Sequence, residues 1–162
     1  MLEIILKLIE VSFWSGIAAV GFGILFNVPR SAIITVFALG FGAGFIKFAL
    51  MHFGAHVALG SLLAALFVGI ISIPLAHRIH QPPVVFSIPP VIPMIPGYFA
   101  YETVLSIMNF IFIETNTNKR LALIDAIFTN SFSMVFVLIS LTVGVALPML
   151  LLKKNSVKKI DI

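Results

Sequence analysis

Proline and glycine are concentrated in one stretch that is otherwise apolar enough for a lipid bilayer. Residues 87–98 read SIPPVIPMIPGY, with four prolines and one glycine. Helix interiors normally exclude proline, because it lacks the backbone N–H and its ring clashes with the preceding turn. In lipid an unpaired backbone carbonyl is costly, so irregular backbone persists only where protein or a water-filled cavity covers it. The stretch therefore predicts a broken membrane helix beside a passage.

The end of such a break could bind an anion. If Pro90, Pro93 and Pro96 form a polyproline II turn, they lie on one side and the carbonyls between them point elsewhere. We expect residues 87–96 to be non-helical, and a helix to begin at Gly97 and run to about 113, for a length of about 25 Å. Its first N–H groups and the positive end of its dipole would then lie below the membrane surface, where they suit a substrate carboxylate. A purely structural kink is the alternative.

The candidate substrate-binding residues belong to this break and to the turns that follow it. They are Pro89, Pro93, Pro96, Gly97, Tyr98, Tyr101 and Glu102. Glu102 follows the predicted helix start by about one and a half turns, so it could relay a proton or bind a substrate ammonium. An equally good interpretation is that Glu102 pairs with Lys47 or with a basic residue of another subunit.

Charged and polar residues elsewhere are candidates for gating, because ionisable groups inside a membrane are costly and often functional. These candidates are Asn27, Arg30, Lys47 and His52. Lys47 lies near the end of an apolar segment, so it is either an interfacial anchor or a ligand. Lys7 and Glu10 are three residues apart on one helical face, where they could neutralise each other or extend to the interface.

Several kinds of chemistry are disfavoured by the residues present. The chain has no cysteine, which excludes thiol catalysis, thiolate metal sites and disulfides. His52 and His56 have the i,i+4 spacing of a metal-binding pair, but no carboxylate or cysteine accompanies them, so we expect no metal site. No serine has a plausible base and orienting partner, and nothing resembles a nucleotide-binding loop. The sequence therefore predicts no catalytic residue, no cofactor and no enzyme.

Composition places the chain in a membrane. Of its 162 residues, 60% are hydrophobic and only 10% are charged, and the mean hydropathy is +1.18. This leaves too little polar surface to enclose a soluble core, so we predict an all-α integral membrane protein. The net charge of +4 is spread over loops and a terminal lysine cluster. We interpret residues 153–162 as a basic cytoplasmic tail rather than a nucleic-acid site.

Five transmembrane helices are expected in one domain that covers residues 1–162. A spanning helix needs about 20 apolar residues, and four segments meet this directly: about 4–27, 31–51, 57–77 and 121–152. The fifth, about 84–113, is fourth along the chain and is broken by the proline-rich stretch. The polar run 114–120 is the expected linker. The first apolar segment lacks an obvious cleavage site, so we expect it to stay as an uncleaved helix.

An odd number of spans puts the two termini on opposite sides. One side holds Arg30, Arg78 and the four lysines of the tail, whereas the other holds Lys7, Lys47, Lys119 and Arg120. Because cytoplasmic loops carry an excess of Lys and Arg, we expect the N-terminus outside and the C-terminus in the cytoplasm.

Small residues recur every four positions in the first three spans. They are Ser15, Ala19 and Gly23, then Gly40 and Gly44, then Ser61, Ala65 and Gly69. Such stripes let helix backbones approach closely in lipid. We expect them to pack helices; a permeation surface lined by the glycines of the second span is the alternative.

Four sequence runs together resemble the small subunit of the threonine/serine exporter family. They are GFGILFNVPR at 21–30, MHFG at 51–54, PPVIPMIPG at 89–97 with Ala100-Tyr101 after it, and GVALP at 144–148. The resemblance covers nearly the whole chain in order. Glu102 departs from the family pattern.

The resemblance implies a secondary exporter of small amino acids such as threonine and serine in the inner membrane. A longer multi-span partner subunit would supply a second set of spans, giving a hetero-oligomer with an inverted repeat, and an ion or proton gradient would drive transport. This chain is similar to the C-terminal half of fused single-chain members. Its partners would thus be that subunit, the bilayer and a small-molecule substrate, and a homo-oligomer is also open.

Two other functions remain compatible with the residues. Export of small dicarboxylates would suit the helix amino end and Arg30 but not Glu102. Alternatively, the chain is a structural or assembly subunit whose broken span docks the partner.

Overall fold

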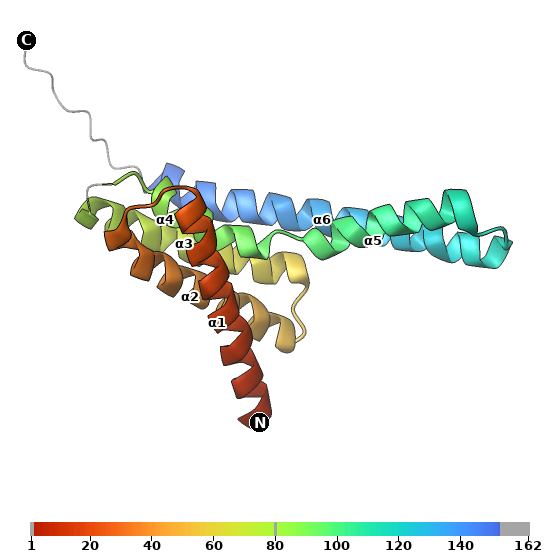
Figure 1. The fold of residues 1–162 in the computed structure, drawn as a ribbon, viewed down its shortest axis with the longest axis horizontal. Helices are drawn as coiled ribbons and strands as arrows, with labels where there is room; N and C mark the ends of the chain where they lie inside the picture. The colour runs from red at the N-terminus through yellow and green to blue at the C-terminus, as the bar shows by residue number, and fades with distance from the viewer. Residues whose placement is uncertain (1, 80, 153–162) are drawn as a thin grey trace, which may run out of the picture.

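The computed structural model describes residues 2–79 and 81–152 of the chain. Within these ranges every regular element is helical, which confirms the predicted all-α class. The tail at 153–162 lies outside the described residues. The elements, drawn in Figure 1, are α1 (Leu2–Leu25), η1 (Arg30–Ala32), α2 (Ile33–His52), α3 (Val57–Ile79), α4 (Val84–Val91), η2 (Ile92–Met94), α5 (Gly97–Met108), η3 (Asn109–Ile113) and α6 (Thr117–Leu151).

The predicted set of five membrane spans, one of them broken, matches these helices. Four helices are long and apolar enough to cross a membrane: α1, α2 with η1, α3 and α6. One bent pair, in which Val84–Met94 and Gly97–Ile113 meet at 43°, is apolar enough when taken together and makes a fifth span if its two helices form one crossing. Helix α6 has 35 residues and is therefore about 52 Å long, which exceeds the roughly 30 Å of a hydrocarbon core. Figure 1 shows α5 and α6 side by side, extending well beyond α1, α2 and α3.

The first helix ends at Leu25 because Asn27 reverses the chain. Asn27 is the one non-glycine residue with positive φ, 57°, among those described. The N–H of Val28 bonds to the carbonyl of Gly23 at 2.9 Å and that of Asn27 to Ile24 at 3.0 Å, which is the hydrogen-bond pattern of a Schellman cap. The structure thus gives Asn27 a capping role at an exposed turn.

The predicted linker at 114–120 is wrong for its second half, since Thr117–Arg120 form the first turn of α6. Asn116 explains the early start, because its side chain accepts the N–H of Asn118 at 3.0 Å and so caps the helix. Arg120 then folds back, and its Nη1 donates to the carbonyl of Glu114 at 3.1 Å. The polar composition of 114–120 indicated a loop, but the cap at Asn116 lets the helix begin at Thr117.

The small-residue stripes pack pairs of helices, as expected. A Cβ added at Gly40 of α2 would lie 2.5 Å from the Cβ of Ala19 on α1. At Gly69 of α3 an added Cβ would lie 2.9 Å from the carbonyl oxygen of Gly144 on α6. Helix α1 therefore packs against α2, and α3 against α6, at distances that only glycine permits. The glycines of α2 face a neighbouring helix, so they are packing residues and not a permeation surface.

The first half of the broken span is held between these two pairs. Helix α4 contacts α1, α2 and α3, and its residues Phe86, Ser87, Pro89 and Pro90 are buried. Met94, just before the break, belongs to a core cluster with Ala43 of α2, Val68 of α3 and Val137 of α6. The break therefore begins inside the protein, although α5 leaves it along an exposed path.

Candidate functional site

The break in the fourth span is shorter than the sequence predicted. We expected residues 87–96 to be non-helical, but α4 continues through Pro89 and Pro90 to Val91, and η2 reaches Met94. Two adjacent prolines remove only two donors, and their fixed φ lies in the helical range. Hydrogen bonds on both sides of the prolines keep the helix continuous. Before them the Ser87 N–H donates to the Pro83 carbonyl at 3.1 Å, and after them the Ile92 N–H donates to the Ile88 carbonyl.

Only Ile95 and Pro96 leave the helical conformation. Ile95 has φ −57° and ψ 133°, which is extended, because the Pro96 ring disfavours a helical residue before it. The proposed polyproline turn through Pro90 and Pro93 is therefore wrong, since Val91 and Ile92 are both helical. Gly97 begins α5 as predicted, and an added Cβ there would meet nothing within 4 Å.

Backbone groups at the break are only partly paired. The Gly97 N–H donates to the Ile95 carbonyl at 2.8 Å, and the Ala100 N–H to the Pro96 carbonyl at 3.3 Å. The N–H of Gly97, one of those expected to be available, is thus occupied. The first N–H groups of a helix have no partner within it, so the N–H groups of Tyr98 and Phe99 remain for a ligand at the amino end of α5.

Lys47 points at this break from α2. Its side chain is only 9% exposed, and its Nζ donates to the carbonyl of Met94 at 3.2 Å. The same Nζ lies 5.9 Å from the centre of the Phe48 ring. The anchor interpretation is therefore wrong, because this ammonium lies inside the helix packing instead of extending to an interface. It joins α2 to the last carbonyl before the break.

The tyrosines and Glu102 of α5 lie outside this buried contact. Tyr98 is 69% and Tyr101 62% exposed, while Glu102 is half-buried. In the described part of the chain the one ion pair joins Lys119 and Glu114, at 3.7 Å, so Glu102 does not pair with Lys47. Of the prolines, Pro89 and Pro96 are buried and Pro93 is half-buried. The structure thus brings Lys47 to Met94, which lies three residues before the start of α5.

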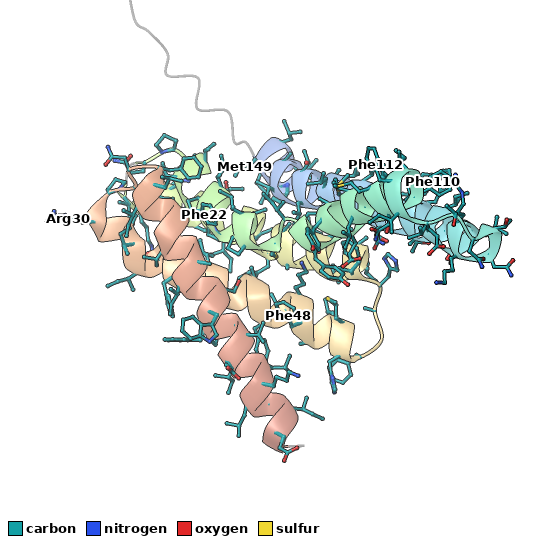
Figure 2. All side chains as sticks on the ribbon, turned by 45° about the vertical axis from the view of Figure 1, so that its right-hand side comes forward. Phe22, Arg30, Phe48, Phe110, Phe112 and Met149 are labelled. Carbon is teal, nitrogen blue, oxygen red and sulfur yellow. The ribbon has the colours of Figure 1, made fainter. Side chains whose placement is uncertain are left out.

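The remaining gating candidates lie away from the break. Figure 2 shows Arg30 at the outer edge of the molecule, beside the turn between α1 and α2. His52 is exposed at the end of α2, where it lines an open cleft of about 470 Å³ together with Lys7. Within the described ranges, Lys7 and Glu10 form no ion pair, and no group of three metal-ligating side chains occurs there either.

Sequence reasoning missed two features of the site. One is the Met94 carbonyl, a backbone atom that no residue pattern identifies. The other is an apolar groove of about 400 Å³ between α4 with η2 and the second half of α6, whose lining includes Ile92, Ile95 and Thr142. Since Ile95 is the extended residue, this groove reaches the break. The packing of this chain therefore leaves the break open on one side.

We expect Pro96→Ala to weaken the transport that the family resemblance implies, because it straightens the span. Alanine restores an N–H that can bond to the Ile92 carbonyl and removes the restriction on Ile95, so α4 and α5 can join. Such a helix would withdraw the N–H groups of Tyr98 and Phe99 into internal bonds. Export should fall about 10-fold, a loss of about 1.4 kcal/mol, while Pro93→Ala, inside η2, should have the smaller effect. Unchanged export by Pro96→Ala would show that the break is not used.

Comparisons with known proteins found a matching family and related sequences. The family model described as "Threonine/Serine exporter, ThrE" matches residues 11–151. An "Uncharacterized protein" of Haemophilus influenzae is 29% identical over 146 residues, which cover 90% of this chain and 48% of that protein. The chain thus spans about half the length of this curated relative. No solved structure matches.

Proposed function

The chain belongs to the threonine/serine exporter family, and from that premise we propose that it is one subunit of a secondary transporter that exports small amino acids across the cytoplasmic membrane. The observation that carries this proposal is the break between η2 and α5, which begins at the buried Met94 and is open at Ile95, with an ammonium bonded to Met94 and a helix amino end at Gly97. Irregular backbone at membrane depth is tolerated where it is buried in protein or lines a cavity. Broken helices of this kind hold the substrate in many secondary transporters.

A longer partner subunit is part of the proposal. Two observations support it: the relative is about twice as long as the stretch it shares with this chain, and the α5–α6 pair extends beyond the other helices (Figure 1). The outer part of that pair is rich in exposed apolar side chains, Ile111, Phe112, Leu121, Ile124 and Phe128 among them. A second set of spans would cover this surface and close the groove beside Ile95.

Export of dicarboxylates is the second candidate, because the buried Lys47 provides a cation. Glu102, on the first turns of α5, weighs against it, since a second carboxylate would meet a like charge. A purely structural subunit would need a break sealed by its own packing. The open groove at Ile95 makes that function the weaker candidate.

The test is substrate efflux from cells loaded with radiolabelled threonine or succinate. Three kinds of cell are compared: cells that express the chain alone, cells that express it together with a longer family member encoded beside it, and cells that express neither protein. We expect fast threonine efflux only when both proteins are present. Efflux of succinate alone would favour the dicarboxylate function, and a complex that assembles without moving either compound would favour the structural one.

The proposed orientation has the amino end outside and the carboxyl end in the cytoplasm, as the charge distribution predicts. The chain has no cysteine, so single cysteines report sidedness directly. We expect Phe53→Cys, in the exposed α2–α3 turn, to react with a membrane-impermeant maleimide in intact cells. Ser31→Cys, exposed in η1 just before α2, should react only after the cells are opened. The opposite pattern would reverse the orientation.

A further inference from the structure

The ammonium of Lys47 lacks a counter-ion within the described ranges. The side chain is 9% exposed, it forms no ion pair there, and its recorded hydrogen bond is the one to the Met94 carbonyl at 3.2 Å. A lysine ammonium has three donors, so two are left in a low-dielectric setting. Buried charges without a partner are costly and inside a membrane are functional candidates by default.

The Met94 carbonyl is a replaceable partner. It is the last carbonyl of η2, and a continuous helix would give it a donor from Gly97 or Tyr98. At the break the Gly97 N–H is turned to the Ile95 carbonyl, and Tyr98 makes no bond to Met94. A neutral carbonyl also compensates a cation less well than a carboxylate, because the carbonyl offers only a dipole whereas the carboxylate carries a full opposite charge. An anion that reaches this place therefore competes well for Lys47.

The amino end of α5 provides a second group for the same anion. Helix α5 has 12 residues, its positive dipole end lies three residues after Met94, and the N–H groups of Tyr98 and Phe99 have no acceptor within the helix. Gly97 itself is exposed, and an added Cβ there would meet nothing within 4 Å, so this chain leaves the side of the helix start where a side chain would lie uncovered. A carboxylate at the break could thus approach both the ammonium and the helix end.

We propose that Lys47 binds the α-carboxylate of the exported amino acid at this break, and that the carboxylate replaces the Met94 carbonyl as its partner. The released carbonyl then accepts a hydrogen bond from the α-ammonium of the same molecule. The pair recognises a zwitterion, so it favours amino acids over dicarboxylates. This inference rests on the proposed export function and names the residue that binds the substrate carboxylate.

The test uses the chain purified together with its longer partner and reconstituted in liposomes. Counterflow of radiolabelled threonine is measured with unlabelled threonine or threoninamide as competitor, since the amide keeps the ammonium and removes the carboxylate charge. We expect threoninamide to compete at least about 10-fold more weakly in the wild type, a difference of about 1.4 kcal/mol. Lys47→Met should raise the half-saturating threonine concentration about 10- to 100-fold and remove this preference.

Two further variants separate recognition from scaffolding. Lys47→Arg keeps the charge and should keep the preference for threonine over threoninamide, whereas Lys7→Met, at an exposed lysine of α1, should behave as wild type. Equal competition by threoninamide in the wild type would overturn the inference, even if Lys47→Met does not assemble. A Lys47→Met complex that still prefers threonine would also overturn it. Absence of threonine counterflow in the wild type would instead contradict the export function.

Discussion

Gly97→Leu is expected to abolish threonine export while the protein still inserts and assembles. An added Cβ at Gly97 meets nothing within 4 Å, so the larger side chain does not disturb the packing of this chain. It adds a bulky apolar group in the first turn of α5, beside the N–H groups of Tyr98 and Phe99 where we place the substrate carboxylate. Efflux from threonine-loaded cells should fall to the level of cells without the chain, at an unchanged amount of protein in the membrane.

Gly21→Leu is the matched control, because Gly21 of α1 is likewise exposed and open, with nothing within 4 Å of an added Cβ. It introduces the same side chain far along the sequence from the break and should leave efflux intact. If Gly97→Leu exports threonine at the wild-type rate, the amino end of α5 is scaffold, and the structural function becomes the leading candidate.

Gly144→Leu should have the largest effect on stability, because it forces α3 and α6 apart. An added Cβ at Gly144 would lie 2.6 Å from the Cβ of Ala65 and 2.9 Å from the carbonyl oxygen of Leu62. A backbone atom cannot move aside as a side chain can, so the helices must separate. We expect a loss of about 3 kcal/mol or more, at the upper end of the overpacking range.

Thermal unfolding of the detergent-purified protein measures this effect. The midpoint should fall strongly for Gly144→Leu and stay near the wild-type value for Gly21→Leu. Ala65→Gly combined with Gly144→Ala should unfold above Gly144→Ala alone, because it removes the nearer contact. A Gly144→Leu protein with the wild-type midpoint would show that α3 and α6 do not pack as described.

Much of the fold was predictable because lipid leaves few choices. A segment that crosses a bilayer must satisfy its own backbone hydrogen bonds, so the apolar lengths alone predicted the helices. The stripe containing Gly40 predicted a close helix contact for a similar reason, since only small residues allow it. The start of α5 at Gly97 followed from the prolines before it.

The details of the site depended on the balance between backbone hydrogen bonding and the restrictions of each proline, and on tertiary packing. A residue pattern reveals neither. Pro89 and Pro90 stay helical because backbone hydrogen bonds before and after them hold the helix where their own N–H groups are missing. Pro96 breaks the span because it forces Ile95 out of the helical conformation. Lys47 stood near the end of its span in sequence, but in three dimensions its side chain is buried and its Nζ reaches the Met94 carbonyl of η2. Its partner, a backbone carbonyl, is a consequence of that packing.

The central claim is that the exported amino acid binds at the break beside Gly97. A single Gly97→Cys substitution, in a chain that has no other cysteine, tests it by the rate of reaction with a small water-soluble thiosulfonate in the reconstituted complex. The wild-type complex, treated in parallel, accounts for any cysteines of the partner. We predict that the introduced thiol reacts and that threonine slows the reaction, while threoninamide at the same concentration slows it much less. A thiol that reacts at the same rate with and without threonine, in a complex that still transports it, would contradict the account.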